Sequence, residues 1–104
     1  MSGSTASERE LFLVGLMRQS LDAYERGDSG LGRLVADVES VLDALGEISH
    51  QDWVEELRST WSGLEIVYAI ALDQGRPSLT DEERGNVNDT ITELRSLLDA
   101  RTST

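Results

Sequence analysis

The chain has 104 residues and carries 20 acidic side chains against 9 basic ones, which gives a formal net charge of −11 at pH 7. This charge opposes binding to nucleic-acid phosphates, which depends on Lys and Arg, and to anionic membrane surfaces. Cysteine is absent, which excludes a disulfide framework and a thiolate metal site. The length fits one domain over residues 1–104, with flexible ends at 1–7 and 101–104. No basic start with a following apolar run is present, and we expect a cytoplasmic protein with no signal peptide.

The first predicted helix begins after Ser7, which has capping-box spacing with Glu10. Gly27 supplies a left-handed stop after the last turn. The apolar positions of this segment are Leu11, Phe12, Val14, Leu16, Met17, Leu21 and Tyr24.

The second predicted helix has the most regular pattern of the chain. Asp28 or Ser29 is expected to cap its start, and Gly46 is expected to end it. Its apolar residues recur at spacings of three and four, at Leu31, Leu34, Val35, Val38, Val41, Leu42 and Leu45. This single stripe predicts an amphipathic helix.

The third predicted helix begins after Ser49, with Asp52 in the capping-box position. One face carries Trp53, Leu57, Trp61, Leu64, Tyr68 and Ala71. Residues 64–72 are apolar almost all round, which predicts a buried half of the helix. A short buried strand is the alternative for these residues, because Ile, Val and Tyr favour strands. A helix is preferred because the sequence offers no second strand for pairing.

Two kinds of side chain in this helix have alternative roles. Glu65 lies in the apolar part, where a buried carboxylate needs a partner or takes up a proton. Its candidate partners are Arg18, Arg26 and Arg33. Trp53 and Trp61 are eight residues apart on one face, and core packing explains both. A partly exposed Trp53 would instead serve as an interface anchor.

Residues 73–77 form a predicted turn, and Thr80 with Glu83 forms another capping box at the start of the fourth helix. Its narrow apolar stripe is Val87, Ile91, Leu94 and Leu98. Because the connections are short, neighbouring helices should be antiparallel. The expected fold is all-α, a single-domain up-down four-helix bundle. Its third helix should be central and largely buried, and its fourth the least buried.

Groups that carry catalysis or bind metals are scarce in this sequence. His50 is the only histidine, and no Glu lies three residues before it, as a di-metal helical site would require. No calcium loop or phosphate loop is present. We therefore expect a non-enzymatic protein without a metal or cofactor.

A limited resemblance to acyl carrier proteins is found at Asp28-Ser29. Those proteins are also small, acidic and four-helical, and their modified Ser follows an Asp at the start of the second helix. The resemblance would make Ser29 the attachment point. The sequence departs from the family at Gly30, where an apolar residue is expected. A simple helix cap is the alternative role of Ser29.

The acidic residues are concentrated in one interval. Between Arg33 and Arg58 the sequence has no basic residue apart from the neutral His50. The acids in the interval are Asp37, Glu39, Asp43, Glu47, Asp52, Glu55 and Glu56. The last three have a local explanation, because acids favour a helix N-terminus. The other explanation of the interval is a surface that attracts a basic partner rather than a plain solvated face.

A line of like charges runs along the second helix within this interval. Glu39, Asp43 and Glu47 are spaced by four, which places them along one helical edge. Like charges at this spacing destabilise a helix by roughly 0.2–0.5 kcal/mol per pair. These three residues are therefore the first candidates for a partner-binding surface.

Three segments together resemble small acidic helical immunity proteins of bacterial contact-dependent or polymorphic toxin systems. The segments are Tyr24-x-x-Gly27, Leu31-x-x-Leu34-Val35-x-Asp37-Val38-Glu39, and Trp61-x-x-Leu64-Glu65-x-Val67-Tyr68-Ala69-x-Ala71-Leu72-Asp73. The resemblance spans roughly residues 20 to 98, and its most specific part is the last segment. It fixes no individual functional residue.

The resemblance implies a protein that binds a toxin domain and blocks its active site. Many such toxins are nucleases with basic substrate-binding surfaces, which an acidic protein can occupy as a mimic of nucleic acid. The expected partner is thus a basic toxin domain, bound by the acidic interval. The alternatives are a structural bundle, or a homodimer sealed by exposed apolar surface on the fourth helix.

Overall fold

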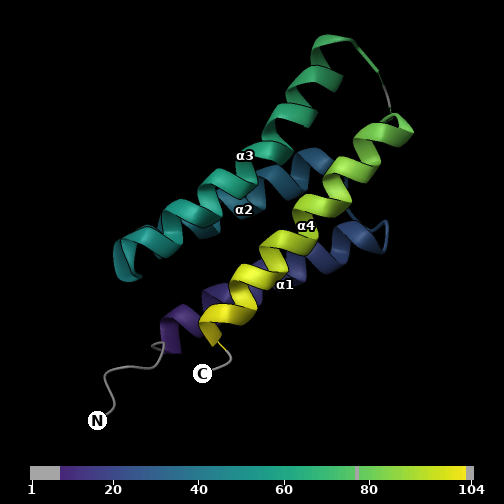
Figure 1. Ribbon diagram of the computed structural model, residues 1–104. Helices are drawn as coiled ribbons and strands as arrows, with labels where there is room; N and C mark the ends of the chain where they lie inside the picture. The colour runs from purple at the N-terminus through teal and green to yellow at the C-terminus, as the bar shows by residue number, and fades with distance from the viewer. Residues whose placement is uncertain (1–7, 77, 103–104) are drawn as a thin grey trace.

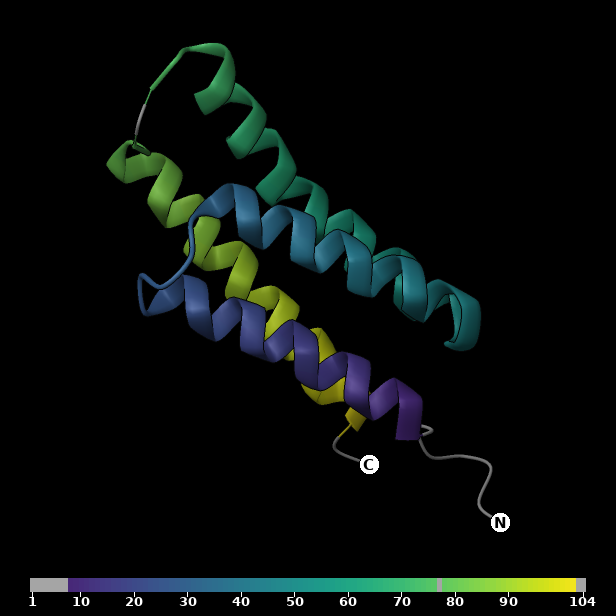
Figure 2. The same cartoon turned by 180° about the vertical axis from the view of Figure 1, so that it is seen from behind.

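The computed structural model describes the backbone of residues 8–76 and 78–102, and the side chains as far as residue 100. These ranges contain helices and turns but no strand, so the strand alternative for residues 64–72 is wrong. The helices are α1 (Glu8–Glu25), α2 (Leu31–Ile48), α3 (Gln51–Asp73) and α4 (Asp81–Thr102). Each helix packs against the next one in the chain, and α4 returns to contact α1 (Figure 1). The view from behind shows the same alternation of direction (Figure 2). The predicted up-down four-helix bundle is confirmed.

Two glycines end helices by the mechanism that the sequence predicts. Gly27 and Gly75 have φ angles of +82° and +65°, the left-handed conformation that costs glycine no steric strain. After α1, the Gly27 and Asp28 amides donate to carbonyls of the last turn at 3.0 and 2.8 Å. The Gly75 and Arg76 amides do the same after α3, both at 3.0 Å. Both connections therefore satisfy helix-end carbonyls that would otherwise lack a donor.

The capping box at the start of α4 is confirmed in both directions. The Glu83 amide donates to Thr80 Oγ1 at 3.1 Å, and the Thr80 amide donates to Glu83 Oε1 at 2.9 Å. Two free N–H groups are satisfied reciprocally, which fixes the first turn.

The other predicted helix ends differ from the structure. The partner of Glu10 in its predicted capping box, Ser7, lies outside the described residues. The residue that caps α2 is Gly30, not Asp28 or Ser29, and it offers no side-chain oxygen. His50 takes the cap position of α3 without a side-chain bond, so Ser49 does not cap it.

Two helices also extend past their predicted C-terminal ends. Gly46 lies inside α2, which continues to Ile48. Fraying is expected from residue 101, whereas the helical backbone continues to Thr102.

The core is formed by one stripe from each helix. The predicted residues of the α2 stripe are all buried, and those of the α4 stripe are at most 1% exposed. From α1 the core receives Leu13, Val14, Met17 and Leu21, and from α3 it receives Val54, Leu57, Trp61, Leu64 and Val67. The predictions for Leu11 and Phe12 are wrong, because these side chains are 47% and 61% exposed.

The second half of α3 is less buried than predicted. Glu65 is exposed, and so are Ile66, Ile70 and Leu72 at 57%, 44% and 61%. The physical reason is that α3 packs only against α2 and α4 among the described helices, so its outer side faces solvent. With 23 residues against 18, α3 is also longer than the antiparallel α2, and its end projects past the α1–α2 connection, as both ribbon views show (Figures 1 and 2). The bundle is confirmed, but the all-round burial of residues 64–72 is wrong.

A close contact marks the level at which α2 begins beside α3. A Cβ at Gly32 would lie 2.7 Å from the Tyr68 hydroxyl, so the tyrosine ring packs directly on the backbone of the first turn of α2. Among the described helices, none combines the length and apolar composition needed to cross a membrane.

Candidate partner-binding surface

The line of three acids on α2 is exposed to solvent. Glu39, Asp43 and Glu47 follow one edge of the helix, outside its buried stripe, and all three are exposed. Their carboxylates are therefore accessible to a partner.

The two arginines at the ends of the acidic interval form ion pairs with acids inside it. Arg33 Nε donates to the Asp37 carboxylate at 3.1 and 3.2 Å within one turn of α2. Arg58 Nη2 of α3 donates to Asp43 Oδ1 at 2.6 Å across the α2–α3 contact. Both pairs are exposed, and exposed pairs contribute about 0–1 kcal/mol each. Two of the seven acids are thus partly neutralised.

Five acids of the interval have no basic partner among the described residues. Within residues 8–76 and 78–100 none of these carboxylates forms an ion pair, and all are exposed. They are Glu39, Glu47, Asp52, Glu55 and Glu56. The unpaired negative charge spans the α2–α3 hairpin, with both helices contributing.

The seven acids do not share a single face. Asp37 lies toward α1, where it lines a groove between α1 and α2. Glu56 lies toward α4, because it precedes Thr60 by one turn and Thr60 Oγ1 donates to Glu93 Oε2 of α4 at 3.4 Å. The structure brings together Glu39, Asp43 and Glu47 and separates Asp37 and Glu56 from them.

The groove between α1 and α2 has a volume of about 490 Å³. Its walls include Leu16 and Ala23 of α1 and Val41 of α2. Ser29 and Asp28 lie at one end, where Arg26 Nε holds Asp28 at 3.0 Å. Ser29, the attachment point in the acyl-carrier alternative, therefore lines a surface groove and does not cap α2.

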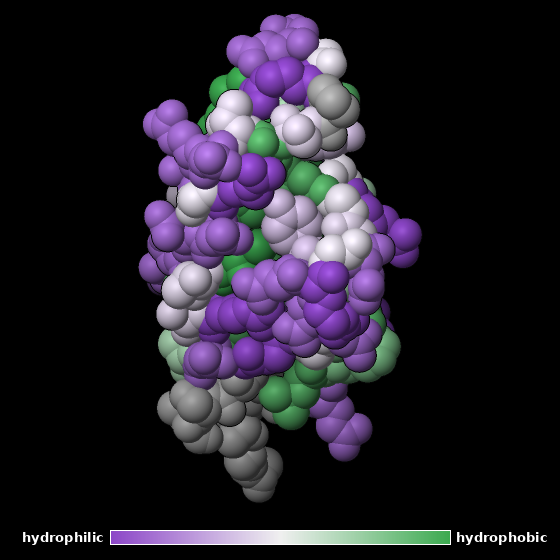
Figure 3. Space-filling model, turned by 90° about the vertical axis from the view of Figure 1, so that its right-hand side faces the viewer, coloured by the Kyte–Doolittle hydropathy of each residue, from purple (hydrophilic) through white to green (hydrophobic). Residues whose placement is uncertain are grey.

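A smaller cavity of about 210 Å³ lies at the end of the bundle where α1 ends and α2 begins. Its wall includes Tyr24, Tyr68 and Arg76 together with leucine side chains. On this side of the molecule, hydrophobic atoms are visible in a hollow between polar side chains (Figure 3). Burial raises the pKa of the Tyr24 hydroxyl above its ordinary value of 10.0, although the nearby Arg84 charge opposes that shift.

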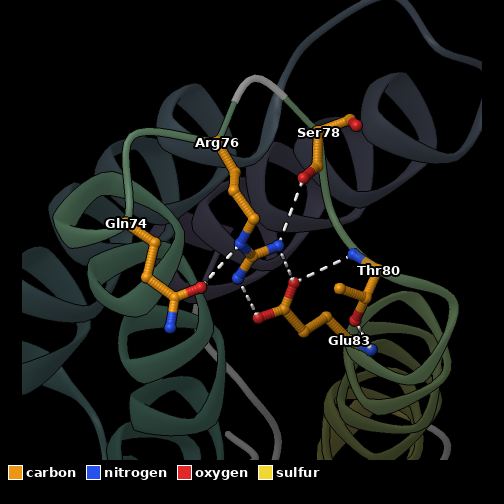
Figure 4. A network of polar contacts seen from close by, with 5 residues as sticks. All are labelled: Gln74, Arg76, Ser78, Thr80 and Glu83. Atoms are coloured by element: carbon orange, nitrogen blue, oxygen red, sulfur yellow. Dashed lines mark hydrogen bonds and ion pairs between the residues drawn. The ribbon is translucent and has the colours of Figure 1, made fainter.

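The Arg76 guanidinium beside this cavity is already hydrogen-bonded to other residues of the chain (Figure 4). Arg76 donates to both oxygens of Glu83 at 2.7 and 2.6 Å, to Gln74 Oε1 at 2.7 Å and to the Ser78 carbonyl at 3.3 Å. The hydrogen bonds to Glu83 raise the pKa of Arg76, and the hydrogen bonds from Arg76, followed by the one from the Thr80 amide, lower the pKa of Glu83 to about 2. The arrangement ties the α3–α4 connection to α4 and leaves little of the guanidinium for a ligand.

The histidine and the two tryptophans do not form a binding site. His50 is exposed at the start of α3, and the described residues contain no cluster of His, Cys, Asp and Glu able to hold a metal. Trp61 is buried and donates to the Val35 carbonyl of α2 at 3.1 Å. Trp53 donates to the Leu97 carbonyl of α4 at 2.9 Å, so its indole joins two helices of the bundle.

The exposed apolar side chains differ in position from the sequence-based expectation. Along residues 81–100 of α4 no large hydrophobic side chain is exposed, so the expected apolar surface on the fourth helix is wrong. Exposed hydrophobic residues lie instead on α1, α2 and α3, and Ile66 and Ile70 are neighbours on one helical edge. The sequence did not distinguish this exposed edge, because the whole segment 64–72 is apolar.

Comparison of the chain with protein-family models, with curated proteins and with solved structures finds no match in any of the three searches.

Proposed function

We propose that this chain is a non-enzymatic, cytoplasmic inhibitor of the immunity-protein type, which binds and neutralises a basic toxin domain. The observation that carries the proposal is the group of five exposed and unpaired carboxylates on α2 and α3. A cationic partner would be attracted over about 10 Å at 0.1 M salt, and such attraction raises association rates by about 10–1,000-fold.

The position of the charge supports recognition in preference to solubility alone. Acids at Asp52, Glu55 and Glu56 are favoured near the start of α3, but Glu39 and Glu47 lie in the middle and at the end of α2. A carboxylate near a helix C-terminus interacts unfavourably with the helix dipole. The fold therefore carries a charge arrangement that its own stability does not require.

The test uses the C-terminal domain of the protein encoded by the gene immediately upstream, which we expect to be basic, mixed with this protein in equimolar amounts. We expect loss of the toxin activity and an association rate that falls steeply as the salt concentration rises. In the triple variant Glu39→Arg, Glu47→Arg and Glu55→Arg, association should slow about tenfold or more. This choice leaves the Asp43–Arg58 pair intact.

A matched control changes the net charge equally at other places. Glu8→Arg, Glu65→Arg and Asp73→Arg alter exposed acids outside the acidic interval that form no ion pair with the described residues. This variant should slow association much less. Equal slowing in both variants would contradict the location of the surface, and an uninhibited toxin would contradict the function.

A further inference from the structure

Two exposed isoleucines form a continuous apolar edge on α3. Ile66 and Ile70 are 57% and 44% exposed, and their spacing of four places them side by side on the helix. Single exposed hydrophobic side chains are ordinary on protein surfaces. Two adjacent exposed isoleucines in the second half of α3 form an apolar patch that is in contact with water in the isolated chain.

This edge lies along the outer side of the α3–α4 contact. Gly63 of α3 faces α4 closely, because a Cβ there would lie 3.3 Å from Thr90 Oγ1. Ile66 and Ile70 follow Gly63 by three and seven residues, which puts them on the same helical edge. Figure 1 shows α3 and α4 side by side along this length.

Acids from both helices lie beside the apolar edge, along the α3–α4 contact. Glu93 joins the contact through Thr60, and helical spacing places Asp89 and Glu82 along the same side of α4. Glu56 lies one turn before Thr60 on α3. All four carboxylates are exposed, and none forms an ion pair with any residue that the structure describes.

The described arginines of this hairpin are held by other acids. Arg58 pairs with Asp43 of α2, Arg84 pairs with Asp81, and Arg95 pairs with acids of α1. Arg76 is bound by Glu83. The outer side of the α3–α4 contact therefore presents apolar side chains and negative charge without a neighbouring free cation.

We propose that this surface, comprising Ile66, Ile70, Glu56, Glu82, Asp89 and Glu93, is the docking site for a cationic amphipathic helix of a partner protein. Apolar side chains spaced by four on that helix would cover the isoleucines, and its Lys or Arg side chains would meet the acids. An apolar centre with a polar rim is the usual composition of a protein interface, and a helix lying against a hydrophobic surface is a recurrent binding mode.

Charge selects this occupant over two others. A second copy of the chain would place one acidic rim against another, which costs free energy for each like-charged contact. An anionic lipid surface would be repelled for the same reason. The inference rests on the proposed function only in requiring a basic partner, and it assigns the apolar contact to a face of the molecule other than the α2 line.

The probe is a fluorescently labelled synthetic peptide of about 18 residues, or five helical turns, made of Leu and Lys with the leucines on one helical face. A second peptide has the same composition with the leucines distributed all round. Fluorescence anisotropy at about 0.1 M salt, where surface charges are partly screened, gives both affinities. We expect the amphipathic peptide to bind at least about tenfold more tightly than the control peptide.

The decisive variant is Ile66→Ser with Ile70→Ser, which should weaken binding of the amphipathic peptide by about tenfold or more. Leu11→Ser with Phe12→Ser is the matched control, because it removes two exposed hydrophobic side chains from α1 and should change the affinity less than about twofold. Circular dichroism confirms that both variants remain helical. Equal binding of the two peptides, or unchanged binding by the isoleucine variant, would overturn the inference.

Two further measurements separate this inference from its alternatives. Sedimentation should give a monomer of 11.4 kDa, and a dimer abolished by Ile66→Ser and Ile70→Ser would assign the surface to a second copy instead. The triple variant at Glu39, Glu47 and Glu55 should retain preference for the amphipathic peptide. If that variant loses the preference while the isoleucine variant keeps it, the α2 line is the binding surface and the inference fails.

Discussion

Glu83 has more structural contacts than any other carboxylate described at the start of α4. Its carboxylate accepts a hydrogen bond from the Thr80 amide, and its own amide donates one to the Thr80 side chain. It also accepts two hydrogen bonds from Arg76. One side chain therefore fixes both the first turn of the helix and the preceding connection. Such charge-assisted bidentate bonds hold geometry more firmly than neutral hydrogen bonds do.

Replacing Glu83 by Gln should lower the melting temperature in a pH-dependent way. The hydrogen bonds from Arg76 lower the pKa of Glu83 from 4.5 to about 2 in the folded chain. A carboxyl with a lowered pKa stabilises the fold above its unfolded pKa, and the contribution is lost as the pH falls toward the folded pKa. The difference in melting temperature between the native chain and Glu83→Gln should therefore be largest near neutral pH and shrink from about pH 4.5 toward pH 2.

Glu82→Gln provides the control for this titration, because its carboxylate is exposed and forms no ion pair in the described part of the chain. Its pH profile should follow that of the native chain closely. A constant difference for Glu83→Gln over the whole pH range would show that the carboxylate charge is not what ties the connection to α4.

At the scale of the helix, sequence periodicity was sufficient where one face of a helix is buried along its whole length. The α2 and α4 stripes are buried as predicted, because their apolar residues point to one side only. Residues 64–72 differ because apolar residues occur on every side of α3. Their burial depends on which sides of α3 face α2 and α4, which the local pattern does not contain.

Two alanine substitutions in α3 should distinguish the buried side of residues 64–72 from the exposed side. Leu64 is fully buried, so Leu64→Ala should reduce the free energy of unfolding by about 2–5 kcal/mol. Ile66 is 57% exposed, so Ile66→Ala should cost less than about 1 kcal/mol. Urea unfolding followed by circular dichroism measures both. Similar losses for the two variants would mean that this half of α3 is buried all round after all.

The candidate surfaces were only partly predictable, because ion pairing depends on residues distant in sequence. The acidic interval and its line on α2 can be read directly from the sequence. The neutralisation of Asp43 by Arg58 needs the α2–α3 contact, and the hydrogen bond from Thr60 to Glu93 needs the α3–α4 contact. Helical spacing within one segment cannot supply either.

At the scale of the whole molecule, a net charge of −11 should make stability depend on salt. Self-repulsion of like charges opposes the compact state, whereas the exposed ion pairs contribute only about 0–1 kcal/mol each. Raising sodium chloride from about 0.01 to 0.5 M shortens the screening distance from about 30 Å to less than 8 Å. The melting temperature should therefore rise with salt.

The α2 line provides an internal check on this charge effect. Glu39→Gln with Glu47→Gln removes two like charges that Asp43 separates, and each like pair costs roughly 0.2–0.5 kcal/mol. The double variant should melt at a higher temperature than the native chain at low salt and respond less to added salt. A melting temperature that falls with salt would show that the ion pairs outweigh the repulsion.

The closure of the bundle has a consequence for how the chain reaches this structure. Every packed pair of helices consists of chain neighbours, except α1 with α4. That pair is joined by Arg18 with Asp99 and by Arg95 with Asp22 and Glu25, all at the molecular surface. A topology with so few sequence-distant contacts has a low contact order, for which the loss of chain entropy before native contacts form is small. Folding can thus proceed by the zipping of successive helical hairpins, and only the meeting of the first and last helices requires the two halves of the chain to find each other.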